Sequence, residues 1–284
     1  MTNQISTYPE AERRLAPLAA AQSPDATVLY PILLNSIPKA GSSLLRAIVL
    51  AMPGAYWAGH IAATRELKTW RERLQRLQES VLDLRPGSVY AAHLPYAPEI
   101  AQWLHAQGIK QFFLYRDPRD ITVSLRHFVM QQTPAAFHAL FTRLGSDEER
   151  LMAVIRGIGR GQRAYEVSRA AYPSVRLDCE VYLGWMSDSE SYALRYEDFV
   201  SSTPGQRADA AGATVAGMLA YLGLPGHTPD APLIEAILSE GMDPARSYTF
   251  RRGSSGAWRE EYTPEHLAAF RSVAGDLLER LGYA

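Results

Sequence analysis

The chain alternates between short apolar runs and longer amphipathic segments, a pattern that predicts strands alternating with helices. Residues 28–37 form a nearly continuous apolar run, typical of a strand that is buried on both faces. Shorter runs predict further strands at 88–92, 109–115 and 191–195. Amphipathic segments predict helices at 44–52, 64–80, 98–105, 118–130, 210–222 and 232–240, and a last helix that Thr263 and Pro264 begin and Gly282 ends. Strands and helices in alternation are joined by right-handed crossovers, so we expect an α/β fold with a mostly parallel central sheet flanked by helices.

These elements are compatible with a single domain spanning residues 1–284. The 284 residues are 47% hydrophobic, which is ample for a core, and α/β sheets of this size commonly form one unit. Segment 133–173 is predicted to be mainly helical with interruptions at its glycines. Residues 1–25 mix charged side chains with alanines, so we expect a loosely ordered N-terminal extension. The sequence contains no coiled-coil heptad and leaves the oligomeric state undetermined.

Charge and cysteine content exclude several classes of protein. Lys and Arg total 29 against 30 for Asp and Glu, a net charge of -1, so the balance indicates neither a nucleic-acid nor a membrane partner. Cys179 is the only cysteine, which excludes an intramolecular disulfide and a cysteine metal cluster. No apolar run approaches the ~20 residues of a membrane span, and the start of the chain lacks the pattern of a signal peptide. These features favour a cytoplasmic protein.

Four chemically useful side chains lie at or just beyond the ends of predicted strands. They are Lys39, His93, Arg116 and Tyr196. In open parallel sheets, ligands bind beyond the carboxyl ends of the strands. We therefore expect these four residues to converge on one site.

The loop between the first strand and its helix predicts an anion site. Residues 39–43 combine Lys39 with Gly41 and two serines at the start of a helix, where free backbone N–H groups favour negative charge. A plain strand-to-helix turn has a similar pattern, so the loop alone leaves both readings open. It departs from the nucleotide triphosphatase loop, in which Lys directly precedes Ser or Thr and the first glycine lies six positions before that Lys. This departure disfavours a magnesium-dependent kinase.

Several motifs follow one another along the chain. They are Ile-Pro-Lys-Ala-Gly-Ser-Ser at 37–43, His-Leu-Pro at 93–95, Arg-Asp-Pro-Arg-Asp-Ile-Thr-Val-Ser at 116–124, Tyr-Glu-Asp-Phe at 196–199, and Phe-Arg-Arg-Gly at 250–253 followed by Gly-Ala-Trp at 256–258. In this order they resemble the motifs of cytosolic-type sulfotransferases that use 3′-phosphoadenosine-5′-phosphosulfate (PAPS). The resemblance spans most of the chain. It implies transfer of a sulfonate group from PAPS to a hydroxyl, or an amine, of a small-molecule acceptor, with release of adenosine 3′,5′-bisphosphate (PAP) and no metal.

The resemblance also implies a role for each matching residue. The 5′-phosphosulfate would be held by Lys39, Ala40, Gly41, Ser42 and Ser43. The 3′-phosphate would be bound by Arg116, Ser124, Arg251, Arg252 and Gly253. Tyr196 would reach the adenine, His93 would accept the acceptor's proton, and Lys39 would neutralise charge on the leaving oxygen.

The sequence departs from this family at informative positions. Leu44 stands where a tryptophan usually stacks on the adenine, and Ala91 stands where a lysine often adds a second positive charge. Because members differ in their base, His60 is the nearest rival to His93. Two other functions stay open: a non-catalytic protein that binds PAPS or PAP, and a metal-dependent phosphotransferase on a related phosphate-loop fold. The acceptor would be lined by Tyr96 and by the segments 55–64, 127–141 and 181–186, which mix aromatics with few charges and favour a small or medium organic acceptor.

Overall fold

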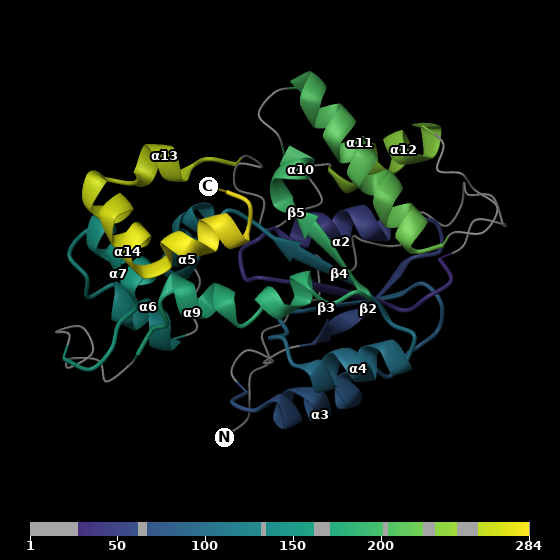
Figure 1. Cartoon of the computed structure of the whole chain (residues 1–284), viewed down its shortest axis with the longest axis horizontal. Coiled ribbons are helices and arrows are strands. Elements are labelled where there is room, and N and C mark those ends of the chain that lie inside the picture. Colours follow the sequence, from purple (N-terminus) through teal and green to yellow (C-terminus); the bar gives the residue numbers. More distant parts are fainter. Residues whose placement is uncertain are drawn as a thin grey trace.

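The centre of the molecule is a five-stranded sheet in which neighbouring strands run parallel (Figure 1). The structure is a computed structural model that describes residues 28–61, 67–131, 135–161, 171–200, 204–223, 231–242 and 255–283. The strand order is β2-β3-β1-β4-β5, with β1 at Ile32–Ser36, β2 at Tyr56–Ile61, β3 at Ser88–Ala92, β4 at Lys110–Tyr115 and β5 at Ser191–Arg195. The expected α/β fold with a parallel central sheet is confirmed. The expected N-terminal extension, residues 1–25, lies outside the described residues.

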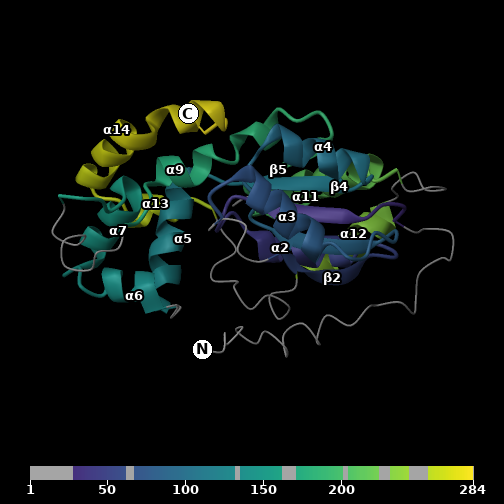
Figure 2. The ribbon, with the colours of Figure 1, turned by 90° about the horizontal axis from the view of Figure 1, so that it is seen from below.

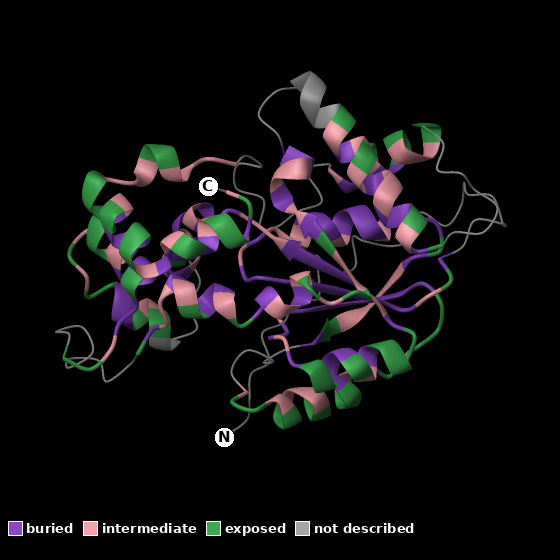
Figure 3. Cartoon of the chain, viewed as in Figure 1, coloured by how far each residue is buried: buried purple, intermediate pink, exposed green. Residues whose placement is uncertain are grey.

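The middle strands form the floor of the core. Every residue of β1 and β3 is buried, as their apolar runs predicted (Figure 3). Asn35 and Ser36 are the buried polar residues of β1, and the side chain of Asn35 donates to the carbonyl of Leu94 at 3.1 Å and accepts from the N–H of Leu94 at 2.8 Å. The indole of Trp185 donates to the same carbonyl at 2.8 Å. Since the buried amide group is hydrogen-bonded through both its oxygen and its NH₂ group, it fixes the chain directly after β3.

Strand β2 is absent from the strands predicted from the sequence. It lies at the edge of the sheet beside β3, and most of its residues are only half-buried. A half-exposed edge strand needs neither a continuous apolar run nor a strict alternation, so its sequence carries little periodic signal. Its register with β3 shifts between Trp57 and Gly59, as in a β-bulge.

Helices cover both faces of the sheet (Figure 1). On one face α2 (Ser42–Leu50), α11 (Pro204–Tyr221) and α12 (Ala231–Gly241) pack together. On the other lie α3 (Trp70–Ser80) and α4 (Pro98–Ala106), which contact each other. Short elements flank β5: a 3₁₀ helix at Leu183–Met186 before it and α10 (Tyr196–Val200) directly after it. The helix α10 begins at Tyr196, so β5 ends at Arg195, as predicted for the strand at 191–195.

A second group of helices gathers to one side of the sheet, on the left in Figures 1 and 2. Its members are α5 (Pro118–Gln131), α6 (Ala135–Phe141), α7 (Asp147–Arg156), α9 (Val175–Glu180), α13 (Trp258–Glu261) and α14 (Pro264–Arg280). The first two helices of the glycine-interrupted segment 133–173 are α6 and α7. Thr263 caps α14 as predicted, with its hydroxyl accepting from the N–H of His266 at 3.3 Å. Among the described residues, the structure contains no helix that is both long enough and apolar enough to span a membrane.

Candidate functional site

The loop between β1 and α2 is a tight bend that only particular residues can form. Lys39 and Gly41 both have left-handed backbones, with φ of 68° and 110°. A Cβ on Gly41 would lie 2.5 Å from the ring of Tyr196, so a larger residue would clash with that ring. Gly41 offers no capping side chain to α2, and the first turn of this helix has no acidic residue. The N–H groups at the start of α2 and the charge of Lys39 can therefore act together on an anion.

Lys39 is a half-buried cation whose ammonium lies over an aromatic ring. Its Nζ is 4.1 Å from the ring centroid of Phe128 on α5. Burial, and secondarily the nearby charge of Arg116, lower the pKa of Lys39 from 10.5 to about 8. An anion bound beside Lys39 would relieve both penalties, so the residue is prepared for a negatively charged ligand.

Arg116 follows β4 and lies over the same tyrosine that contacts the loop. Its guanidinium is 4.3 Å from the ring centroid of Tyr196, and its Nη2 is 3.5 Å from a carboxylate oxygen of Asp120. The ring of Tyr196 is thus in contact with Gly41 and lies under Arg116. The structure brings together three sequence-predicted residues: Arg116 directly after β4, Tyr196 of α10 and Gly41 in the loop after β1. The predicted contact of Tyr196 with adenine stays a prediction.

Two residues of α5, Ser124 and Phe128, lie on the face of the helix near the loop that holds Lys39. Ser124 is half-buried and precedes Phe128 by one helical turn, so both lie on the same face of α5. Because Phe128 contacts Lys39, Ser124 belongs to the face of α5 that looks toward the loop. The sequence places Phe128 only within a segment expected to line the acceptor, and nothing in that pattern predicts its contact with Lys39.

His93 is held in one defined tautomer at the end of β3. Its Nδ1 is 2.9 Å from the carbonyl oxygen of Ser36, the last residue of β1. A carbonyl can only accept, so Nδ1 carries the hydrogen and, in neutral His93, Nε2 carries the lone pair. The hydroxyl of Ser36 lies 3.2 Å from the same nitrogen. The bond ties His93 to Ser36, which lies three residues before Lys39 in the chain.

The two candidate bases are neighbours. His60 is an exposed residue of β2 that pairs with Ala91 of β3, and its ring centroid is 6.4 Å from that of His93. Residues in register on adjacent strands point to the same face of a sheet, so the small side chain of Ala91 lies on the same face as His60. Leu44, the other departure from the family pattern, is a buried core residue in the first turn of α2.

The predicted C-terminal motif is described only where it rejoins the helices. Arg251, Arg252 and Gly253 lie outside the described residues. Just after them, the N–H groups of Gly256 and Trp258 donate to the two carboxylate oxygens of Asp120. Asp120 belongs to the motif at 116–124, but nothing in the pattern of α5 predicts that its carboxylate accepts from these two backbone N–H groups.

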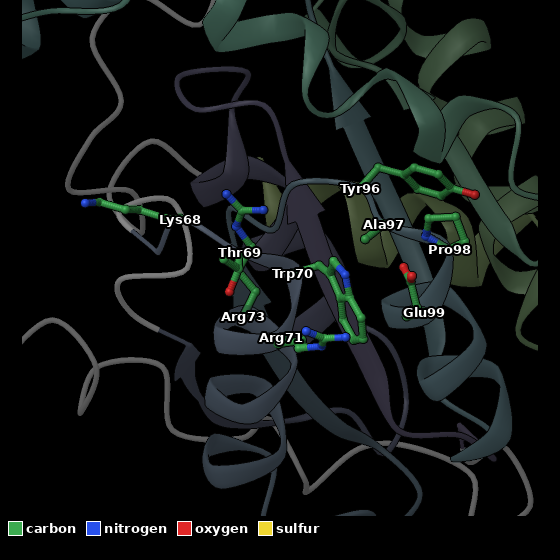
Figure 4. A pocket seen from close by; sticks show the side chains of 9 residues that line it. All are labelled: Lys68, Thr69, Trp70, Arg71, Arg73, Tyr96, Ala97, Pro98 and Glu99. Carbon is green, nitrogen blue, oxygen red and sulfur yellow. The ribbon is translucent and has the colours of Figure 1, made fainter.

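An open groove lies between the first turns of α3 and α4 (Figure 4). It has a volume of about 590 Å³, and Tyr96, expected from the sequence to line the acceptor, is one of its walls. The remaining lining residues are Lys68, Thr69, Trp70, Arg71, Arg73, Ala97, Pro98 and Glu99. Tyr96 follows His93 closely along the chain. Within the described ranges, no group of three or more histidine, cysteine, aspartate or glutamate side chains is arranged to hold a metal.

Comparison with solved structures identifies the fold. No family model and no curated protein matches the sequence. The mouse sulfotransferase SULT7A1 complexed with PAP aligns over 98% of this chain and 91% of its own, with a TM-score of 0.57 and 17% sequence identity. Retinol dehydratase complexed with androsterone and the inactive cofactor PAP aligns over 87% of this chain and 80% of its own, at a TM-score of 0.51 and 14% identity. Retinol dehydratase complexed with retinol and PAP aligns over 94% of this chain and 85% of its own, with a TM-score of 0.51 and 14% sequence identity. The chain has the sulfotransferase fold.

Proposed function

We propose that the chain is a PAPS-dependent sulfotransferase with a small or medium organic acceptor. The observation that carries this proposal is the grouping of Lys39, Gly41, Tyr196 and Arg116 at the carboxyl ends of the strands. Two cations with a helix N-terminus suit a ligand that bears more than one phosphate-like group. The similarity in fold to two kinds of PAP-bound protein supports the same ligand.

The residues present fit such a nucleotide. The first turn of α2 has no capping side chain and no acidic residue, so its N–H groups can bind the 5′-phosphosulfate, with the hydroxyls of Ser42 and Ser43 beside them. The 3′-phosphate is assigned to Arg116, Ser124, Arg251, Arg252 and Gly253. The adenine is assigned to the neighbourhood of Tyr196. The proposal takes residues 1–284 as one domain acting in the cytoplasm.

The chemistry needs a proton acceptor and a fixed positive charge. When bound, PAPS supplies an activated sulfonate group, which passes to the acceptor oxygen as PAP leaves. His93 takes the acceptor's proton at Nε2, because its Nδ1 hydrogen is held by the carbonyl of Ser36. The ammonium of Lys39 stabilises negative charge on the departing phosphate oxygen. Both tasks use groups of this chain, so the mechanism requires no metal.

The base assignment has one competitor within reach. His60 lies beside His93 at a ring separation of 6.4 Å, and either imidazole could meet an acceptor between them. The bond from His93 to Ser36 favours His93, since it fixes both the orientation and the tautomer.

The test is a mass-spectrometric screen of phenols, alcohols and amines with PAPS in the presence of a metal chelator. We expect one or more acceptors to gain the mass of one sulfonate, with an equal amount of PAP released. Binding of PAPS with no turnover on any acceptor would favour a non-catalytic nucleotide-binding protein. Phosphate transfer that needs magnesium would favour a metal-dependent phosphotransferase.

A further inference from the structure

The carboxylate of Asp120 joins two parts of the molecule that are far apart in sequence. It lies in the first turn of α5 with only 1% of its side chain exposed. One oxygen accepts from the N–H of Gly256 at 2.7 Å and lies 3.5 Å from Nη2 of Arg116, while the other accepts from the N–H of Trp258 at 3.1 Å. A buried carboxylate is costly unless it is paired, and these three partners satisfy it.

The contacts of Asp120 are part of a longer seam between α5 and the segment around α13. The guanidinium of Arg119 lies 4.0 Å from the ring centroid of Trp258. The hydroxyl of Thr122 is hydrogen-bonded to that of Tyr262 at 2.7 Å. Further along α5, Arg126 pairs with Glu261. The helix therefore holds this segment along most of its length, and Asp120 also pairs with Arg116.

We infer that Asp120 is a positioning residue for recognition of the donor's 3′-phosphate. The inference rests on the proposed function, which assigns that phosphate to Arg116. Asp120 orients the guanidinium of Arg116 and, through the same carboxylate, fixes Gly256 and Trp258 beside it. A guanidinium has five N–H donors in a planar fork, so one edge can face the carboxylate while another faces a phosphate.

The substitution Asp120→Asn tests this role with little change in size. Each carboxylate oxygen accepts from a different backbone N–H group. A neutral amide has one oxygen and one NH₂ group, so it can satisfy one of these N–H groups but must turn a donor toward the other. It also removes the negative charge opposite Arg116. The variant should therefore loosen both Arg116 and the segment that is held at Gly256 and Trp258.

The affinities of PAP and of adenosine 5′-phosphate (AMP) separate this role from a general structural one. AMP lacks the 3′-phosphate and is otherwise the same nucleotide. From the typical strength of charge-assisted hydrogen bonds, Asp120→Asn should weaken PAP binding roughly 10-fold to 150-fold in calorimetry and leave AMP binding nearly unchanged. Asp147→Asn is the matched control, because Asp147 on α7 also pairs with an arginine of α5, Arg126, at 3.1 Å. This control should leave both affinities unchanged.

Each outcome decides between the claims. Equal losses for PAP and AMP in Asp120→Asn, or no loss for either, would overturn the inference while leaving the proposed function standing. A wild-type protein that binds PAP no more tightly than AMP would overturn the proposed function itself, and the inference with it. If Asp120→Asn fails to fold, amide hydrogen exchange on the wild type gives the answer. PAP, but not AMP, should slow exchange at Gly256 and Trp258, and equal protection by the two nucleotides would contradict the role of Asp120.

Discussion

Removing the charge of Lys39 should make the protein more stable and less active. Its pKa is lowered from 10.5 to about 8, chiefly by burial. Since one pKa unit corresponds to about 1.36 kcal/mol, keeping the ammonium in the folded protein costs about 3 kcal/mol below pH 8. The contact with the Phe128 ring, 4.1 Å away, returns about 0.5–2 kcal/mol. We therefore expect Lys39→Met to raise the free energy of unfolding by about 1–2.5 kcal/mol at pH 7.

The pH dependence of stability provides an independent test of the penalty at Lys39. The pKa of Lys39 is lower in the folded chain than in the unfolded one, so the unfolded state binds more protons between about pH 8 and pH 10.5. Wild-type stability should gain from this residue across that window as pH rises, whereas below about pH 8 both states are protonated and the penalty is constant. Lys39→Met should lack this contribution, so the two proteins should converge in stability at high pH.

Urea unfolding at pH 7 and at pH 10 measures both effects. Lys110→Met is a suitable control, because Lys110 also lies over aromatic rings, 4.9 Å from that of Tyr221, but pairs with Glu190 at 3.9 Å. This control should lose stability or stay unchanged. The proposed role predicts that Lys39→Met lowers kcat on the order of 100-fold, a larger effect than on donor affinity. A Lys39→Met protein that is less stable than wild type at pH 7, with an unchanged pH profile, would refute the reasoning.

Three further predictions concern neighbouring residues. Arg116→Ala should weaken PAPS binding roughly 10-fold to 150-fold and barely affect adenosine 5′-phosphosulfate, and calorimetry with equal losses for both would contradict the 3′-phosphate assignment. His93→Asn should lower kcat roughly 100-fold to 10,000-fold with an alcohol and less with a readily ionised phenol, whereas near-normal turnover beside an inactive His60→Asn protein would make His60 the base. Gly41→Ala adds a Cβ 2.5 Å from a tyrosine ring at φ 110°, whereas at Gly108 φ is 67° and nothing lies within 4 Å of an added Cβ. Thermal unfolding should therefore show a larger loss of stability for Gly41→Ala than for Gly108→Ala, and equal losses would show that only backbone strain matters.

Much of the sheet could be predicted because its middle strands are buried on both faces. The strand β3 has the predicted bounds, and the apolar runs before Lys39 and Arg116 became β1 and β4. The start of α5 was also readable, since Pro118 begins the helix and the carboxylate of Asp117 accepts from the N–H of Arg119 at 2.9 Å. These features depend on local pattern and on burial, which the sequence expresses directly.

The parts that the sequence did not predict depend on contacts between distant residues. The approach of Phe128 to Lys39 and the bonds of Asp120 to Gly256 and Trp258 have no local signature. The edge strand β2 was missed because its residues are mostly half-buried and follow no apolar run. For the same reason the sequence could name His60 as a rival base but could not place it in register with the strand that leads to His93.

The most direct test of the central claim is calorimetric titration of the wild-type protein with PAP and with AMP, each with and without magnesium. Arg116 and its partners at the end of β4 are assigned to the 3′-phosphate, the only group that distinguishes the two nucleotides. If two or more charge-assisted contacts of about 1.5–3 kcal/mol each are made, PAP should bind at least about 100-fold more tightly than AMP, with no dependence on magnesium. Equal affinities for PAP and AMP, or binding that appears only with magnesium, would contradict the account.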